Sequence, residues 1–301
     1  MASVVQGLAP GARVLLVRLR SLGDCVLTTP AIHLLKQYRP DLEIGVMVEE
    51  RFAGVYEANP EVSAILPPSK RAALGFRPRL TVNLHGGPTS AVLTAASLAR
   101  WRAGFAHYKT GWAHNVKIPR AQQILGEERK VHTAEHVASA MFYLGVPRGE
   151  VGRARLFAEE PETREPCLVL HPFASAASKA WPAGRFAEAA RALARGREVV
   201  VLAGPGDDPR PFAEFTVLAG APLAAVKRVL RRAALFLGND SGPAHMAAAF
   251  GVPVVVLYGR SDPVVWAPWR TPARVIAAPE GLPSVSVERV VAAAAELEVA
   301  A

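Results

Sequence analysis

The stretch Gly238-Asn-Asp-Ser-Gly-Pro-Ala-His245 joins an apolar run to an alanine-rich helical pattern. Ser241 or Asp240 can cap that helix, and Pro243 suits its first turn because an amide there has no intrahelical acceptor to lose. The unpaired N–H groups and the positive end of the helix dipole then point over the loop. The stretch therefore predicts an anion site suited to phosphate, with an ordinary capped crossover helix as the alternative.

Two side chains of this stretch have separate uses. Asp240 would repel a phosphate, so it is better suited to accept hydrogen bonds from sugar hydroxyls or to cap the helix. His245, about one turn into the helix, can donate to an oxyanion, and the alternative is a packed core histidine.

A second loop in the same half of the chain carries a lysine. Residues 175–181 follow an apolar run that ends at His171-Pro172, and they include Ser178 and Lys179. A flexible ammonium that converges with backbone N–H groups can neutralise a diphosphate, and a solvated lysine is the alternative.

Near the start of the chain, Arg20-Ser-Leu-Gly-Asp24 separates an apolar run from a helical pattern. Asp24 can take a proton from an acceptor hydroxyl, and the alternative is a first-turn acid or N-cap. The turn lacks the three glycines of the dinucleotide fingerprint, which disfavours an NAD enzyme. Cys25 has no base or orienting partner within the motif, so we expect a small core residue.

The segment His132-Thr-Ala-Glu135-His136 matches the H-x-x-E-H signature of inverted zinc peptidases. Zinc would need a third protein ligand and an open position for water. A five-residue match arises easily by chance, so zinc hydrolysis is kept only as an alternative.

These segments need elements to position them, and apolar runs alternate with helical patterns along the chain. The alternation predicts an α/β fold with parallel sheets that are covered on both faces. Residues 22–38 are expected to form one helix, residues 109–130 an irregular loop that lines something, and residues 133–144 a helix. The expected strands are 13–19, 43–48, 62–66, 80–84, 101–106, 167–172, 198–202, 215–218, 275–278 and the apolar runs on either side of residues 240–251.

The length of 301 residues indicates two domains, and half of the residues are hydrophobic, as in a globular protein. Residues 147–166 are rich in Pro, Gly and charge and are interpreted as the linker. The predicted domains are 1–155 and 156–285, two Rossmann-like halves facing each other across a cleft. A terminal helix, 286–301, is expected to be able to pack back on the first domain.

Lys and Arg number 35 against 26 Asp and Glu, a formal net charge of +9 that favours acidic partners. Clusters such as Arg13, Arg18 and Arg20 are no longer than a solvated face would give, and no basic run is interleaved with aromatics. Sequence-reading nucleic-acid binding is therefore not expected. Two distant cysteines suit a reducing cytosol, and neither an export signal nor an apolar run of about 18 residues is seen. We expect a cytoplasmic protein, with peripheral contact to the inner membrane surface left open.

Taken together, these residues resemble glycosyltransferase family 9, the bacterial heptosyltransferases that move heptose from ADP-heptose onto the inner core of lipopolysaccharide. The matching stretches fall in order over most of the chain. They are residues 20–30, 171–186, 202–206, 238–245 and 258–263.

The resemblance implies the GT-B architecture, with the acceptor on 1–155 and the nucleotide sugar on 156–285. It implies inverting transfer in a single displacement without a metal or a cofactor, the ADP-sugar being a substrate. The implied acceptor is an anionic lipid-linked oligosaccharide. A GT-B nucleotide-sugar epimerase or hydrolase, and a non-catalytic nucleotide-sugar-binding protein, are the alternatives.

Carried over by position, Asp24 would be the general base, with Arg20, Ser21 and Gly23 at the acceptor. The implied donor-binding residues are Ser178, Lys179, Gly204, Asp207, Asp240, Ser241, Gly242, Pro243 and His245. Residues 206–215 are short for the family, so the usual helix with its ribose-binding carboxylate is expected to be absent, with Asp207 or Asp208 as the substitute. Arg260 stands where the family usually has Pro and Ala174 where Gly is common, which leaves the nucleotide base and the sugar open.

Overall fold

The computed structural model describes residues 4–174 and 180–299, and the chain divides into two compact units, residues 1–152 and 153–301. The division falls inside the Pro- and Gly-containing stretch 147–166. Each unit contains one six-stranded sheet in which every pair of neighbouring strands is parallel. The predicted α/β class is therefore confirmed.

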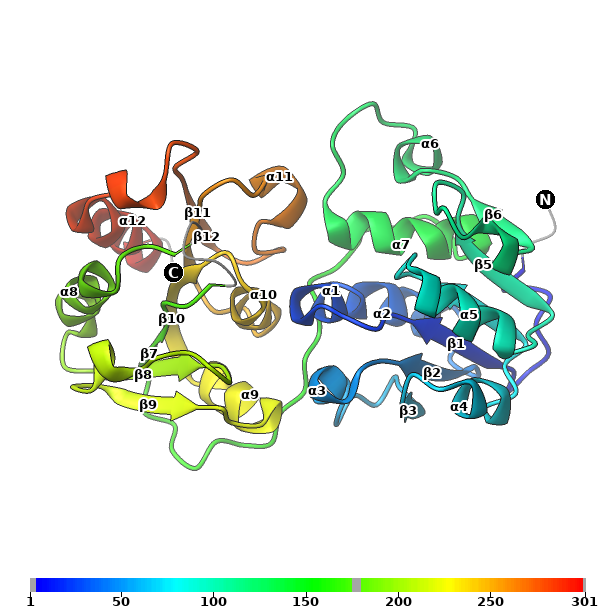
Figure 1. Cartoon of the computed structure of the whole chain (residues 1–301), viewed down its shortest axis with the longest axis horizontal. Helices are drawn as coiled ribbons and strands as arrows, with labels where there is room; N and C mark the ends of the chain where they lie inside the picture. The colour runs from blue at the N-terminus through cyan, green and yellow to red at the C-terminus, as the bar shows by residue number, and fades with distance from the viewer. Residues whose placement is uncertain (1–3, 175–179, 300–301) are drawn as a thin grey trace. The chain divides into compact units, whose positions relative to one another are not determined.

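The sheet of the first unit has the strand order β3-β2-β1-β4-β5-β6 (Figure 1). Strand β1 is buried from its second residue onward, as expected for a parallel strand covered on both faces. The order reverses between β1 and β4, so the carboxyl ends of these two strands are neighbours. The strands are β1 (Arg13–Val17), β2 (Glu43–Met47), β3 (Ala64–Leu66), β4 (Leu80–Asn83), β5 (Trp101–Phe105) and β6 (Val116–Ile118).

Helices pack against the sheet of the first unit in two groups. Helix α2 packs against α7, which also contacts α6, whereas α4 packs against α5. The helices are α1 (Leu22–Val26), α2 (Thr29–Tyr38), α3 (Glu50–Ala53), α4 (Lys70–Gly75), α5 (Pro88–Ala96), α6 (Ala121–Leu125) and α7 (Thr133–Leu144).

The single helix expected over residues 22–38 is in fact two helices, α1 and α2. A continuous helix would need the amide of residue 30 to donate to the carbonyl of Val26, and Pro30 has no N–H. The hydroxyl of Thr29 donates to that carbonyl instead, at 2.8 Å. The chain therefore turns directly after Asp24 and Cys25.

Residues 109–130 are more ordered than expected. They contain a 3₁₀ turn (Gly111–Ala113), the edge strand β6 and helix α6. Each of these is at most five residues long, which is too short for a period-2 or period-3.6 pattern to register.

The second unit repeats the plan of the first, with the strand order β12-β11-β10-β7-β8-β9 and a reversal between β7 and β10. Its strands are β7 (Cys167–His171), β8 (Glu198–Ala203), β9 (Thr216–Ala219), β10 (Ala233–Asn239), β11 (Val254–Tyr258) and β12 (Ala273–Ala277). Its helices are α8 (Ala183–Ala194), α9 (Leu223–Arg231), α10 (Gly242–Ala249), α11 (Pro263–Trp266) and α12 (Val287–Val299), with 3₁₀ turns at Arg210–Phe212 and Leu282–Ser284.

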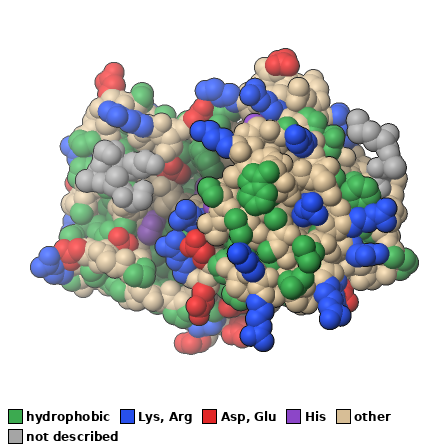
Figure 2. Space-filling view, turned by 45° about the vertical axis from the view of Figure 1, so that its right-hand side comes forward, with side chains coloured by type: hydrophobic (Ala, Val, Ile, Leu, Met, Phe, Trp, Pro, Cys, Tyr) green, Lys and Arg blue, Asp and Glu red, His purple; other side chains and the backbone are tan. Residues whose placement is uncertain are grey.

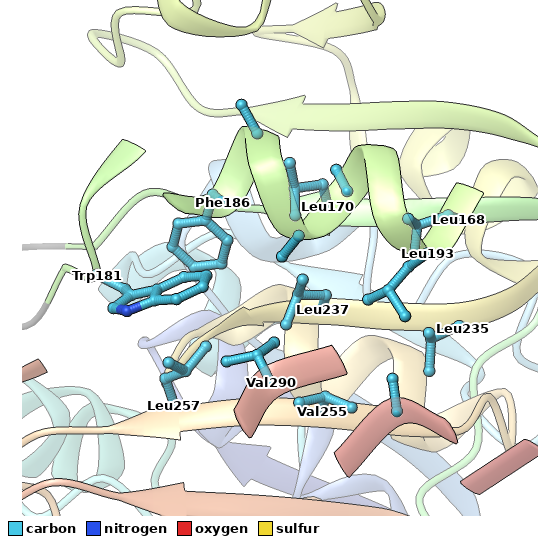
Figure 3. Close-up of a cluster of buried hydrophobic side chains, with 14 of the residues drawn as sticks. Leu168, Leu170, Trp181, Phe186, Leu193, Leu235, Leu237, Val255, Leu257 and Val290 are labelled. Carbon is cyan, nitrogen blue, oxygen red and sulfur yellow. The ribbon is translucent and has the colours of Figure 1, made fainter. Parts of the chain in front are cut away.

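The core of the second unit gathers around Trp181 and Phe186, whose rings meet edge to face at 4.9 Å (Figure 3). The indole N–H of Trp181 donates to the carbonyl of Val285 at 3.0 Å. Val290 and Leu297 of α12 belong to the same buried cluster. The terminal helix was expected to be able to pack on the first domain, but the structure includes it in the second unit, because its apolar face completes this core.

Lys and Arg side chains are spread over the visible face of the molecule, with Asp and Glu side chains between them (Figure 2). On this face the positive excess is not one continuous patch. Within residues 4–174 and 180–299, no helix combines the length and the hydropathy that crossing a bilayer requires.

Candidate active site

The two reversals of strand order define one candidate site in each unit. Ligands of open α/β sheets bind outside the carboxyl ends of the strands at such a point. In the first unit Asp24 follows β1 and His85 follows β4. In the second unit Pro172 follows β7 and Asp240 follows β10.

Asp24 lies in the first turn of α1, with Ser21 at the N-cap. The backbone N–H and the hydroxyl of Ser21 donate to its Oδ2 at 3.3 and 3.1 Å. Its Oδ1 lies 3.2 Å from Nη1 of Arg18. The side chain of Asp24 is partly exposed, so the same carboxylate completes a capping box and is reachable from solvent.

Arg18 is buried directly behind this carboxylate. Its Nε donates to the hydroxyl of Thr28 at 3.3 Å, which fixes the guanidinium from a second side. Our interpretation of Arg18 as part of a solvated basic cluster was wrong. The signal in the sequence is that Arg18 directly continues the apolar run of β1, where a charge is buried unless it is used.

His85 and Tyr108 surround the same point and were not predicted. Burial, and then the positive charges of Arg18 and Arg20, lower the pKa of His85. Burial raises the pKa of Tyr108 to about 12. The ring of Tyr108 presses on Gly86, where φ is +80° and a Cβ would lie 2.6 Å from a ring carbon. Only glycine fits there, so the His85-Gly-Gly turn is the signal that could have identified this wall.

The residues assigned to the acceptor lie around Asp24 but differ in exposure. Arg20 is exposed and lies 3.9 Å from a carboxylate oxygen of Glu49. Ser21 is exposed as well, whereas Gly23 is buried in α1. Cys25 is buried, and burial raises the pKa of its thiol to about 12, which confirms it as a core residue and not a nucleophile.

In the second unit α10 starts at the carboxyl end of β10. Ser241 occupies the N-cap with an extended backbone, and Pro243 lies in the first turn, as predicted. The predicted capping hydrogen bond is absent, because the side chain of Ser241 accepts from no amide of the helix. Its Oγ is buried and has no partner among the described residues. The first N–H groups of α10, starting at Gly242, are therefore not capped by this hydroxyl.

Asp240 is half-buried and faces Tyr258. Burial, together with the negative charge of Asp240 and a hydrogen bond to it, raises the pKa of Tyr258. The carboxylate of Asp240 is thus oriented by a neutral hydroxyl. His245 is buried in α10.

Asn239, the last residue of β10, connects two segments that are distant in the sequence. Its Oδ1 accepts from the backbone N–H of Trp181 at 3.1 Å, and its Nδ2 donates to the carbonyl of Pro172 at 2.8 Å. The amide is fully buried, so both bonds are protected from water. The predicted residues Ser178 and Lys179 lie outside the described residues.

The two candidate ribose-binding carboxylates already have partners. Oδ2 of Asp207 accepts from the backbone N–H of Gly204 at 2.7 Å and closes the turn after β8. Asp208 is paired with Arg210 at 2.7 Å on the surface. Only a 3₁₀ turn, Arg210–Phe212, occupies the short segment before β9.

The zinc interpretation of His132–His136 is wrong. Nδ1 of His132 accepts from the backbone N–H of Ala134 at 3.1 Å, and Glu135 is paired with Arg129 at 2.7 Å. The ring of His136 stacks on Phe105 with a centroid distance of 4.1 Å. Nowhere in the described parts of the chain do three His, Cys, Asp or Glu side chains come together as metal ligands would.

Two parallel sheets with the 3-2-1-4-5-6 strand order, each with polar residues at its reversal point, define a protein of the nucleotide-sugar-binding α/β class. The family model described as glycosyltransferase family 9 (heptosyltransferase) matches residues 80–293. The chain belongs to this family and is a glycosyltransferase, which confirms the resemblance found in the sequence.

Individual relatives agree with this assignment. Lipopolysaccharide heptosyltransferase 3 of Escherichia coli is 28% identical over 295 residues, which cover 83% of this chain and 84% of that protein. The glycosyl transferase family 9 structure from Veillonella parvula aligns with a TM-score of 0.82 at 22% identity, over 96% of this chain and 98% of that one. An E. coli heptosyltransferase solved with ADP aligns with a TM-score of 0.79 at 21% identity, over 95% and 99% of the two chains. The structural likeness establishes a common fold.

Proposed function

We propose that this chain transfers a heptose or a related sugar from an ADP-activated donor to an acceptor of the lipopolysaccharide-core type. The transfer inverts the anomeric centre and uses neither a metal nor a cofactor. Membership of family 9 supports the heptosyl part, as do relatives that are lipopolysaccharide heptosyltransferases.

The observation that carries the proposal is the partly exposed carboxylate of Asp24, which Arg18 and Ser21 hold at the end of β1. The oxygen of the acceptor hydroxyl attacks the anomeric carbon while Asp24 takes its proton. The bond between the anomeric carbon and the phosphate oxygen breaks, and ADP leaves with the electron pair. Arg20, Ser21 and Gly23 are assigned to the acceptor beside this base.

The departing ADP needs positive partners that are in place before the reaction. The uncapped N–H groups at Gly242, the unpartnered hydroxyl of Ser241 and the ammonium of Lys179 fill this role in the proposal. Asp240 accepts hydrogen bonds from sugar hydroxyls. The remaining donor contacts are assigned to Ser178, Gly204, Asp207, Pro243 and His245.

The formal net charge of +9 supports an anionic, lipid-linked oligosaccharide as the acceptor. Such an acceptor implies a cytoplasmic enzyme with peripheral contact to the inner membrane surface. Nucleic acid is not a partner in this proposal.

The test is the variant Asp24→Asn, with Asp208→Asn as a matched control whose carboxylate pairs with Arg210 on the surface. We expect Asp24→Asn to lower kcat by about 10²-fold or more, with ADP affinity by calorimetry unchanged. The control should retain wild-type kcat. Unchanged kcat in Asp24→Asn would reject the base, and turnover of the donor without any acceptor would favour the epimerase or hydrolase.

A further inference from the structure

A cavity of about 740 Å³ lies within the first unit. Small-molecule sites measure about 300–1,000 Å³, so this cavity can hold one or two sugar residues. It is built mainly by α6, by the segment that follows α6, and by the H-x-x-E-H segment whose zinc interpretation was wrong. Its lining residues are His107, Arg120, Gln122, Gln123, Glu128, Arg129, Lys130 and His136.

The charges of the lining favour an anion, and one cation stands out among them. Arg129 is bound by the carboxylates of Glu127 and Glu135, so its charge is largely compensated. The guanidinium of Arg120 pairs with no carboxylate in the described parts of the chain, and its charge is felt by His107, whose pKa it helps to lower after burial. Arg120 can therefore form a charge-assisted hydrogen bond with a ligand at little cost.

The other side chains suit a saccharide. The ring of His136 lies nearly parallel to that of Phe105, with an interplanar angle of 19°. Burial lowers the pKa of His136 to about 4, so near neutral pH its imidazole both donates and accepts. Gln122 and Gln123 add amide donors and acceptors, as sugar hydroxyls require.

The cavity lies close to the proposed base. The positive charge of Arg18, which pairs with Asp24, also contributes to the lowered pKa of His136. Phe105, on which His136 stacks, contacts Tyr108 at 5.6 Å between ring centroids. Tyr108 in turn is within electrostatic reach of Asp24. A sugar chain held in the cavity can thus extend toward the carboxylate that would activate its hydroxyl.

We propose that this cavity binds a sugar residue of the acceptor that carries a phosphate or a carboxylate, and that Arg120 recognises its charge. The inference rests on the proposed function and adds to it the place and the chemistry of acceptor recognition. The motif His132–His136 then has a structural role, because Glu135 holds Arg129 in the lining and His136 forms a wall.

The kinetic test compares Arg120→Gln with Arg100→Gln. Arg100 is exposed at the amino end of β5, far along the strand from Phe105, and its loss changes the net charge equally. Loss of one charge-assisted contact should raise the KM for a phosphorylated or carboxylated acceptor about tenfold in Arg120→Gln. The KM for an acceptor without that group, and the affinity for ADP, should not change. An unchanged KM for the anionic acceptor would overturn the proposal.

A binding test needs no turnover. Saturation-transfer NMR on the full chain would use glucose 6-phosphate, methyl glucuronide and neutral methyl glucoside as probes. We expect transfer to at least one anionic sugar, loss of that signal in Arg120→Gln and its retention in Arg100→Gln. Whichever anionic sugar binds identifies phosphate or carboxylate as the recognised group. Failure of both to bind the wild type, or equal binding to Arg120→Gln, would reject the site, whereas binding without any glycosyl transfer would reject only the proposed function.

Discussion

The guanidinium of Arg18 lies 3.2 Å from the carboxylate of Asp24, and the arginine is the more deeply buried partner, with 9% of its side chain exposed against 21%. A buried cation is stable only when it is paired and hydrogen-bonded, and Asp24 and Thr28 supply both contacts. The pair therefore fixes the carboxylate while leaving part of it open to solvent. A base held in this way needs no reorientation when a hydroxyl arrives.

Arg18→Gln should therefore impair catalysis through Asp24. We expect kcat to fall by about tenfold or more, because a misplaced reacting group is costly, while ADP affinity by calorimetry stays constant. Arg18→Lys should restore part of the loss, since it keeps the charge. Steady-state kinetics with saturating donor would measure both.

The matched control for Arg18 is Arg13→Gln at the other end of β1, where Arg13 pairs with Glu43 on the surface at 2.8 Å. An exposed pair contributes less than about 1 kcal/mol, so this variant should leave both kcat and stability nearly unchanged. Equal kinetics for Arg18→Gln and Arg13→Gln would show that Arg18 does not position the base.

Ser241→Ala should separate ligand binding from helix capping. An N-cap serine replaced by alanine usually costs about 1 kcal/mol because its hydroxyl bonds a helix amide. The hydroxyl of Ser241 makes no such bond, so we expect little change in the free energy of unfolding by urea. ADP affinity by calorimetry should fall about tenfold if the hydroxyl contacts the diphosphate.

Ser69→Ala supplies the contrast, because Oγ of Ser69 does accept from the backbone N–H of Ala72 at 3.1 Å. This variant should lose about 1 kcal/mol of stability and keep its ADP affinity. Loss of stability in both variants, with ADP affinity unchanged, would contradict the ligand role of Ser241.

Asn239→Ala should weaken donor binding, because it removes the bonds that connect Pro172 and Trp181 to the end of β10. Leaving two backbone groups unsatisfied in the interior should also cost about 2–4 kcal/mol in urea unfolding. Calorimetry with ADP is the decisive measurement, since a purely structural amide would not change it at temperatures where the variant is folded.

Asn115→Ala is a matched control for Asn239→Ala. Its side chain likewise bonds two backbone groups, Arg102 N at 2.7 Å and Arg100 O at 2.8 Å, but in the first unit. It should destabilise the protein without affecting ADP. Equal ADP affinity in the two variants would show that Asn239 has no part in the donor site.

The sequence was sufficient for the α/β class and for most strands because parallel strands are buried on both faces. Such strands appear as continuous apolar runs, as in residues 254–258 of β11, where every residue is buried. The turn residues that follow β1 and β10 then indicate the position of Asp24 and Asp240, since caps and glycines have local signatures.

The errors share one physical cause, which is that orientation and pairing depend on distant contacts. Nothing local shows that Glu135 faces Arg129 and not a metal, or that Arg18 points inward to Asp24. The absent cap at Ser241 has the same origin, because a hydroxyl can rotate away from the helix that the residue type predicts it will cap. Residue types were predictable, and their partners were not.

His136 should make the stability of the protein depend on pH in a defined window. Burial lowers its pKa from 6.5 to about 4, so the folded state binds its proton less readily than the unfolded chain does. Above a pH of about 6.5 both states are neutral at this residue, and it has no effect. As the pH falls from about 6.5 to about 4, only the unfolded chain gains the proton, and the free energy of unfolding should decrease by up to about 3 kcal/mol.

Other histidines and carboxylates titrate in the same window, so the effect must be measured as a difference. His136→Phe keeps an aromatic ring against Phe105 and removes the titrating group. Urea unfolding at several pH values between about 7.5 and 4 should give a shallower decline for this variant than for the wild type. Parallel declines would mean that the imidazole takes up its proton in the folded state as easily as in water, and it would then carry a positive charge in the cavity under mildly acidic conditions. In that case His136 would add to the charge of Arg120, and acceptor binding would strengthen as the pH falls below about 6.5.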